Sequence, residues 1–216
     1  MQRLALFDLD DTLIDRRHAL EATLTRFASH HGLAVDEREA LLVRLGDRAC
    51  AADFSVVREL LGLAAPAEEL WRQYLADMAE FAFCPAGLLD GLDDLRRRGW
   101  RIGIATNGSA DIQRAKLDAT GIVHRVHAVC VSSDLGLRKP DPRLFATAAE
   151  RCGAPPGAGG WMVGNDPVKD IAGGRSAGLA TLWIGAPDRW PGDLPAPDRT
   201  APTALSAIHL LLQDTT

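Results

Sequence analysis

Residues 6–15 read LFDLDDTLID, a short apolar run that ends in a cluster of acids. Side chains two residues apart in an extended segment point the same way, so Asp8 and Asp10 should emerge together at the end of a strand predicted over residues 3–8. Two carboxylates this close repel each other unless a divalent cation or a shared proton lies between them. An isolated D-x-D is more often a solvated strand end, so its interpretation depends on the rest of the chain.

Length and composition suit one sizeable α/β domain, or a core domain with a smaller insert. The chain has 216 residues, of which 47% are hydrophobic and 25% charged, and its net charge is −5. This balance favours neither nucleic acid nor an anionic membrane as a partner, and no stretch is apolar for long enough to span a bilayer. Acids interrupt the apolar run near the N-terminus, so we expect no signal peptide. We expect a cytoplasmic protein, since its cysteines are far apart and resemble buried thiols: Cys50, Cys84, Cys130 and Cys152.

The segment from Arg16 to Phe83 has the pattern of a helical block. Apolar residues recur at helical spacing, for example at Leu20, Leu24 and Phe27, and Gly and Pro interrupt the pattern between successive helices. No segment of this block has the character of a strand. We therefore predict about four helices over residues 16–83, inserted into a core formed by residues 1–15 and 84–216.

From Pro85 onward, predicted helices and strands alternate. Repeated units of this length imply a parallel sheet with helices on both faces, the doubly wound, Rossmann-like α/β class. A run with five prolines, residues 187–202, is predicted to be a surface excursion. The predicted strands are 100–105, 128–131, 161–163 and 180–184, and the predicted helices are 88–98, 111–120, 142–151, a segment after 167, and 205–212.

Polar clusters fall where the predicted strands end. Ligands of parallel α/β sheets bind beyond the carboxyl ends of the strands, so these clusters should meet at one edge. Each cluster alone has an ordinary explanation, such as a turn, a solvated lysine or a helix cap. Together they favour a functional site. The clusters are Asp8 with Asp10, Thr106 with Asn107, Lys139, and the segment 164–170 that contains Asn165, Asp166 and Asp170.

The order of these motifs resembles the haloacid dehalogenase-like hydrolase superfamily, in its phosphatase branch, over nearly the whole chain. The most specific match is D-x-D-x-T at residues 8–12 with the following Leu13-x-Asp15. The stretch LRKPDP at residues 137–142, with Phe145, is nearly as specific. The match is weaker at residues 164–170, because Asn165 stands where many relatives have an acid. Which of Asn165, Asp166 and Asp170 contacts a metal is therefore left open.

The resemblance implies Mg²⁺-dependent hydrolysis of a small phosphorylated metabolite through an aspartyl-phosphate. Asp8 would attack phosphorus, and Asp10 would act as general acid and then general base, with its backbone carbonyl on the metal. Mg²⁺ would be bound by Asp8 and by the segment 164–170, here called the fourth motif, and Lys139 would lie opposite it, so that the metal and the ammonium group together neutralise the phosphate. Thr106 and the backbone N–H of Asn107 would hold the phosphate oxygens.

The helical insert lies where this superfamily carries a cap over the site. Such a cap excludes water and supplies most of the contacts to the substrate. Six side chains are candidates to contact the leaving group, although any one of them is more often solvated helix surface. They are Arg16, Arg17, His18, Arg44, Arg48 and Arg58.

The same superfamily includes other activities, and particular residues of this sequence favour or disfavour each of them. Asp10 disfavours a dehalogenase, which lacks the second aspartate, and the absence of lysine between residues 15 and 89 disfavours a phosphonatase, which uses a cap lysine. A phosphomutase with the same nucleophile stays open, as does a regulatory protein whose phosphatase site is impaired. The substrate and the oligomeric state are open as well.

Overall fold

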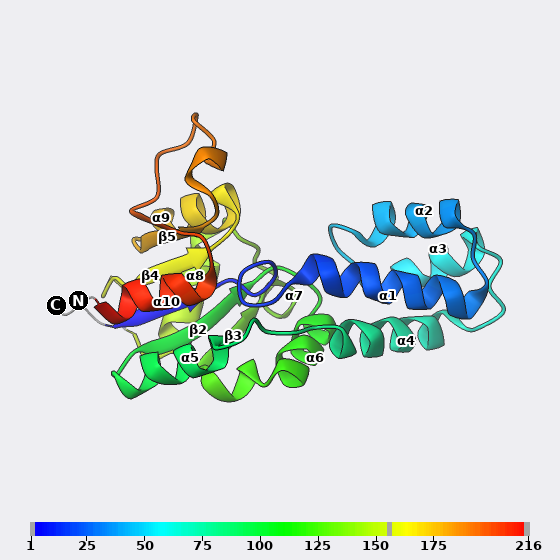
Figure 1. The fold of residues 1–216 in the computed structure, drawn as a ribbon, viewed down its shortest axis with the longest axis horizontal. Helices are drawn as coiled ribbons and strands as arrows, with labels where there is room; N and C mark the ends of the chain where they lie inside the picture. The colour runs from blue at the N-terminus through cyan, green and yellow to red at the C-terminus, as the bar shows by residue number, and fades with distance from the viewer. Residues whose placement is uncertain (1–2, 155–156, 214–216) are drawn as a thin grey trace. The chain divides into compact units, whose positions relative to one another are not determined.

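The computed structural model describes residues 3–154 and 157–213, which form two compact units. The first, here called the sheet unit, contains the chain up to Ile14, Cys84–Asn107, and the chain from Gly121 onward. The second, here called the helical unit, contains Asp15–Phe83 and Gly108–Thr120. Figure 1 shows the strands of the first unit and the helices of the second.

Within the described residues, the sheet unit is built on six parallel strands in the order β3-β2-β1-β4-β5-β6. The central strand β1 is flanked by β2 and β4, with Phe7 opposite both Ile104 and Val163. The strand order reverses between β1 and β4, which is where doubly wound sheets open a crevice for ligands. The strands are β1 (Leu4–Phe7), β2 (Arg101–Thr106), β3 (Ala128–Val131), β4 (Trp161–Gly164), β5 (Ala180–Ile184) and β6 (Arg199–Ala201).

Successive residues of a strand point to opposite faces of the sheet. In this sheet the residues on both faces are apolar, so helices pack against it. Leu4 and Leu6 share a buried cluster with Leu144, Phe145 and Ala148 of α8 (Pro142–Arg151). The helices α5 (Leu88–Arg97) and α10 (Ala204–Gln213) lie side by side (Figure 1), where the small Gly91 admits the side chain of Ile208. The remaining elements are η1 (Ile122–Arg125), α7 (Ser132–Leu135), the π-helical turn η2 (Pro167–Ala172), α9 (Gly173–Ser176) and η3 (Pro187–Arg189).

The doubly wound parallel sheet predicted from the sequence is confirmed, and the predicted strands agree to within one residue at their ends. One prediction was wrong. Residues 187–202 are more than a surface excursion, because β6 within them adds a sixth strand beside β5. Asp198 connects the two strands: its Oδ2 accepts hydrogen bonds from the backbone N (2.8 Å) and the Oγ1 (2.7 Å) of Thr181.

The helical unit has four helices in the segment where four were predicted, and a fifth from elsewhere in the chain. Asp15 caps the first of them by accepting a hydrogen bond from the backbone N of His18 (2.9 Å). The side chains of Phe27, Phe54 and Tyr74 fill its core. The helices are α1 (Arg16–His31), α2 (Val35–Leu45), α3 (Asp53–Leu60), α4 (Ala67–Glu80) and α6 (Ala110–Thr120).

Helix α6 is part of the helical unit because most of its contacts are with helices there, and its Ile112 packs in the core of that unit. The sequence-based division at residues 15/16 and 83/84 counted this helix with the core. That division into domains stays a prediction.

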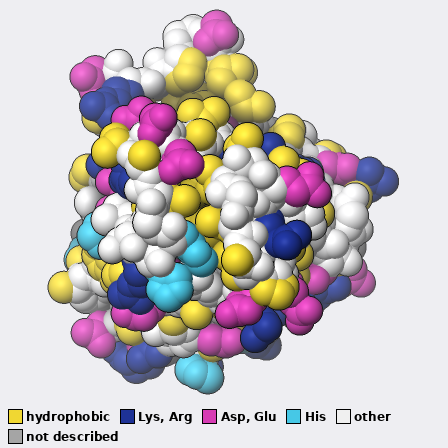
Figure 2. Space-filling model, turned by 90° about the vertical axis from the view of Figure 1, so that its right-hand side faces the viewer, with side chains coloured by type: hydrophobic (Ala, Val, Ile, Leu, Met, Phe, Trp, Pro, Cys, Tyr) yellow, Lys and Arg dark blue, Asp and Glu magenta, His cyan; other side chains and the backbone are white. Residues whose placement is uncertain are grey.

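The surface mixes side chains of all kinds. On the face drawn in Figure 2, acidic and basic side chains lie among apolar ones. In the part of the chain that is described, no helix combines the length and the apolar character needed to cross a membrane.

Candidate active site

Asp8 follows β1 directly, at the carboxyl end of the central strand. Its backbone N still donates to the carbonyl of Val163 (2.9 Å), so Asp8 is held in line with the sheet. The chain then turns tightly: the carbonyl of Leu9 accepts from the backbone N of Leu13 (2.9 Å) and Ile14 (3.1 Å). Asp11 has a φ of 55°, a left-handed conformation that Asp tolerates better than most residues. The turn keeps the Asp8 side chain at the strand end, only 8% exposed.

Lys139 bridges two carboxylates at this edge. Its Nζ lies 2.7 Å from Oδ1 of Asp8 and 2.6 Å from Oδ1 of Asp170, and the residue is only 4% exposed. The loop that carries it is held by Asn107, at the end of β2. Asn107 Nδ2 donates to the carbonyl of Lys139 (3.1 Å), and Lys139 N donates to Asn107 Oδ1 (2.9 Å). Asn107 therefore fixes the backbone from which the ammonium group reaches the acids.

The two acids and one ammonium group form a buried cluster with an excess of negative charge when all are ionised. Burial, only partly offset by Lys139, raises the pKa of Asp8 from 3.8 to about 7. Burial would lower the pKa of Lys139, but Asp170 and Asp8 outweigh it, and the net shift is upward. Lys139 is therefore charged at neutral pH. A further cation near Asp8 would favour its ionised form.

The turn after β4 brings Asp170 back under the strand end. Asp170 is fully buried; Oδ1 faces Lys139, and Oδ2 accepts from the backbone N of Asp166 (3.0 Å). Asp166 caps η2: its Oδ1 accepts from the backbone N of Val168 (2.9 Å) and Lys169 (2.8 Å), while Oδ2 lies 3.1 Å from Lys169 Nζ. The Asp166 carboxylate is thus engaged within the loop, and the Asp170 carboxylate is shared between Lys139 and the loop backbone.

The side chain of Asn165 makes its contact with the turn after β1. Its Oδ1 accepts a hydrogen bond from Thr12 Oγ1 (3.2 Å), so the turn after β1 and the turn after β4 are joined beside Asp8. This contact crosses the point where the strand order reverses.

Gly164 is the last residue of β4 and lies next to the carboxylate of Asp170. A Cβ atom here would lie 2.6 Å from the Cβ of Asp170, closer than real contacts allow. Gly164→Ala should therefore lower the free energy of unfolding by about 1–3 kcal/mol, measured by urea denaturation. Gly192→Ala is the matched control, because a Cβ there meets nothing within 4 Å; it should change stability by less than about 0.5 kcal/mol. Equal stability of the two variants would contradict the proposed crowding.

The oxygen donors at this edge suit a hard divalent cation. In the described residues, no group of three or more His, Cys, Asp or Glu side chains is arranged to hold a metal. A cation would instead use the Asp8 carboxylate, the Asn165 amide oxygen, main-chain carbonyls and water. Mg²⁺ commonly keeps several waters and takes only one or two carboxylates, so this donor set fits it.

The structure brings several predicted residues together and adds contacts that the sequence did not indicate. Asp8, Lys139 and Asp170 share one buried cluster, with Asn107 behind the lysine. Asp10 lies in the turn after β1 and forms a bridge with Ile14, and Thr106 ends β2 with 1% of its surface exposed. The Thr12 contact was missed, although Thr12 is part of the opening motif. A second missed contact is the donation from Trp183 Nε1 to the carbonyl of Asn165 (2.9 Å), which no sequence pattern indicated.

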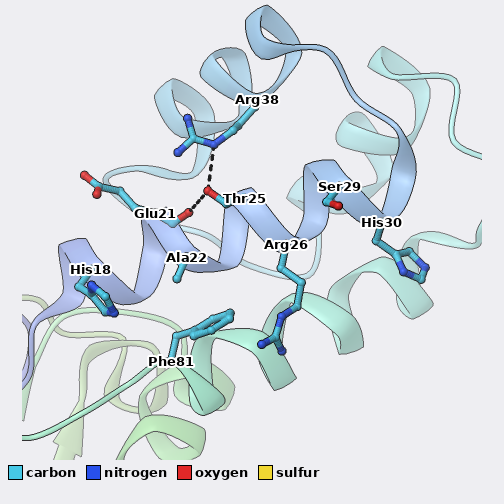
Figure 3. A pocket seen from close by; sticks show the side chains of 9 residues that line it. All are labelled: His18, Glu21, Ala22, Thr25, Arg26, Ser29, His30, Arg38 and Phe81. Carbon is cyan, nitrogen blue, oxygen red and sulfur yellow. Dashed lines mark hydrogen bonds between the residues drawn. The ribbon is translucent and has the colours of Figure 1, made fainter.

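The helical unit carries a hollow of about 750 Å³ over one face of α1 (Figure 3). Arg38 of α2 reaches it, where its Nε donates to Thr25 Oγ1 (3.3 Å). Of the six candidates for leaving-group contacts, His18 lines this hollow. Three others are tied to groups of the helical unit itself: Arg16 donates to the carbonyl of Asp47 (3.3 Å), Arg44 lies 3.7 Å from Asp53, and Arg58 donates to the carbonyl of Ala65 (3.1 Å).

The fold and this edge define the class: a doubly wound α/β protein with a buried aspartate–lysine cluster at the switch point of its sheet. The chain belongs to the haloacid dehalogenase-like hydrolase family, whose model matches residues 2–178.

Named relatives support this assignment. The chain is 42% identical over 93 residues to a phosphoserine phosphatase of Thermus thermophilus, covering 43% of the chain and 37% of that protein. It is 34% identical over 141 residues to the pyrimidine 5'-nucleotidase YjjG of Escherichia coli, covering 65% of the chain and 60% of that protein. The chain thus spans less than two thirds of the length of these curated relatives. A crystal structure of a HAD phosphatase from Thermococcus onnurineus is 27% identical, with a TM-score of 0.71 over 98% of both chains.

Proposed function

We propose that this protein hydrolyses a small phosphomonoester, with Mg²⁺ as cofactor and a phosphorylated aspartate as intermediate. The observation that carries the proposal is the pairing of Asp8 with Lys139 at 2.7 Å, in a buried cluster at the switch point of the sheet. A carboxylate poised as nucleophile beside a fixed ammonium group suits attack on an anionic phosphate, because the ammonium reduces the repulsion between the two anions.

The residues of this chain divide the reaction into two steps. In the first, an Asp8 oxygen forms a bond to phosphorus while the bond from phosphorus to the leaving oxygen breaks, and Asp10 gives that oxygen its proton. In the second, Asp10 takes a proton from water, whose oxygen attacks phosphorus and releases Asp8 and inorganic phosphate. Thr106 and the backbone N–H of Asn107 would bind the phosphate oxygens, and Lys139 would hold Asp8 in place. Bound Mg²⁺ would supply positive charge against the phosphate oxygens.

The metal ligands we propose are Asp8, the backbone carbonyl of Asp10 and Asn165. The oxygens of Asp166 accept from the start of η2 and face Lys169, and those of Asp170 face Lys139 and the backbone of Asp166. These contacts support a structural role for Asp166 and a positioning role for Asp170. Asn165 would then be a neutral ligand, so the site would bind Mg²⁺ with less charge than one with an acid at that position.

The relatives support phosphate-ester chemistry, and their names cover different substrates: phosphoserine in one and a pyrimidine nucleotide in another. We therefore propose a small phosphorylated metabolite as the substrate class, without nucleic acid or membrane as a partner. A cytoplasmic location stays a prediction.

The direct test is a phosphate-release screen over a broad panel of phosphorylated metabolites. With MgCl₂ present, at least one ester should release phosphate, and removal of the metal with EDTA should lower the rate by at least about 100-fold. Restoring MgCl₂ should restore the rate. The control is the same panel without enzyme. Full activity in EDTA would contradict the cofactor, and no release from any ester would favour the regulatory alternative.

A phosphomutase shares the nucleophile, the acid and the metal, and differs in protecting the phosphoaspartate from water. Incubation with a sugar phosphate and its bisphosphate separates the two activities. We expect free phosphate; an isomerised sugar phosphate without net phosphate release would show a mutase instead.

A further inference from the structure

Trp183 contacts the backbone of the fourth motif from the neighbouring strand. It lies in β5 opposite Gly164, the last residue of β4, and is 4% exposed. Its indole Nε1 donates a hydrogen bond of 2.9 Å to the carbonyl of Asn165. The donor thus reaches the first residue beyond the strand, where the chain leaves the sheet to form the loop of residues 165–170.

The indole ring is held in this orientation by its surroundings. Gly185 leaves space that a side chain would fill, since a Cβ there would lie 2.6 Å from a ring carbon of Trp183. On another side, Trp190 makes an edge contact, with ring centroids 5.1 Å apart and planes at 73°. Trp190 is itself anchored, because its Nε1 donates to the carbonyl of Leu194 (3.2 Å). A buried ring enclosed in this way has little rotational freedom, so its N–H is aimed before any ligand binds.

Asn165 is therefore held at both of its oxygens. Trp183 donates to the backbone carbonyl, and Thr12 Oγ1 donates to the side-chain Oδ1 (3.2 Å). An amide oxygen has two lone pairs, so Oδ1 can accept from Thr12 and still offer a lone pair to a cation. A neutral ligand attracts a cation less than a carboxylate does. The orientation of the Asn165 amide must then account for a larger share of the binding free energy.

We infer that Trp183 is a positioning residue, which fixes the peptide of Asn165 so that the amide oxygen faces the cation site beside Asp8. This rests on the proposed function, in which Asn165 is a ligand of Mg²⁺. Groups that hydrogen-bond to a metal ligand commonly change metal affinity by 10- to 100-fold when they are removed. The N–H of Trp183 acts on the backbone of such a ligand, so the expected effect lies at the low end of that range.

The test is Trp183→Phe, which keeps an aromatic ring and removes the N–H. Its matched control is Trp190→Phe, which changes the ring in contact with Trp183 and leaves the hydrogen bond to Asn165 in place. Binding of Mg²⁺ alone is measured by isothermal titration calorimetry. We expect the dissociation constant to rise about tenfold in Trp183→Phe and less than about twofold in Trp190→Phe. The rate of phosphate release at saturating MgCl₂ should fall less than about threefold in Trp183→Phe, because the reacting groups are unchanged.

A second variant tests the N–H alone. Benzothienylalanine at position 183 has nearly the shape of tryptophan, with sulfur in place of the N–H, so it separates the hydrogen bond from the packing and can be used if the phenylalanine variant does not fold. It should weaken Mg²⁺ binding as Trp183→Phe does. Unchanged Mg²⁺ affinity in this variant would overturn the inference and leave the proposed function untouched. Conversely, a wild type that binds Mg²⁺ and releases no phosphate would contradict the proposed function, while a weaker affinity in the variant would still support the role of Trp183.

Discussion

Asp8→Asn should lower phosphate release by at least about 1000-fold while the fold is retained, because the amide cannot serve as the nucleophile. Its Oδ1 can still accept a hydrogen bond from Lys139, which keeps its second partner, Asp170. The measurement is phosphate release under single-turnover conditions, with the far-ultraviolet circular dichroism spectrum and the melting temperature as checks of folding.

The same variant has an effect on stability whose sign follows from the pKa. Burial raises the pKa of Asp8 from 3.8 to about 7. In the metal-free protein this carboxyl binds its proton more tightly than in the unfolded chain, so its contribution to stability falls as the pH rises between those two values. Asp8→Asn removes that contribution. At about pH 8 and without magnesium, the variant should be at least as stable as the wild type, and the difference should shrink below about pH 4.

The matched control for this prediction is Asp11→Asn. Asp11 lies in the same acidic turn, is exposed, and has a φ of 55° that Asn also tolerates. The Asp11→Asn substitution removes one negative charge near the site and leaves the nucleophile Asp8 unchanged, so we expect the rate of phosphate release to change by less than about threefold. Wild-type turnover in Asp8→Asn, or an equally large loss in Asp11→Asn, would contradict the role assigned to Asp8.

Lys139→Met should be the most destabilising single change at this edge. Methionine fills a similar volume but leaves Asp8 and Asp170 buried together without their ammonium partner. Breaking a buried ion pair from one side costs about 3–5 kcal/mol, because the remaining charge is uncompensated. We expect a loss of this size at neutral pH, measured by urea denaturation, together with loss of phosphate release.

The pH dependence of that loss provides a further check. The pKa of Asp8 is already raised above its unfolded value by burial, and loss of the ammonium group removes the interaction that partly offsets this rise. The cost of the buried Asp8 charge is therefore absent below the unfolded value of about 4 and grows as the pH rises. The free energy of unfolding of Lys139→Met should thus be close to that of the wild type at acidic pH and clearly lower at neutral pH.

The double variant Lys139→Met with Asp170→Asn is the control for charge rather than packing. Replacing one of the two acids by a neutral amide should recover part of the stability at neutral pH, without recovering activity. If the double variant were as unstable as Lys139→Met at every pH, lost packing rather than unpaired charge would be the cause.

Much of the fold could be predicted because its signals are local. The alternation of apolar strands with amphipathic helices after Pro85 predicted the parallel sheet, and helical periodicity predicted α1 to α4. The meeting of Asp8, Lys139 and the loop of residues 164–170 followed from one rule, that the carboxyl ends of parallel strands share an edge. The strand β6 was missed because the prolines on either side of it are typical of a loop, and the hydrogen bond beside it, from Thr181 to Asp198, joins residues 17 apart in the chain.

The sequence by itself therefore determined the class of the fold, the edge of the sheet where the acids gather and the presence of a helical insert, since each depends on short-range periodicity and on strand order. Only the tertiary structure decided which partner each polar group takes. It pairs Lys139 with both Asp8 and Asp170, and it holds Asn165 between Thr12 and Trp183. The physical reason is that hydrogen bonds act over about 3 Å, and only packing of the strands and turns brings such distant residues so close.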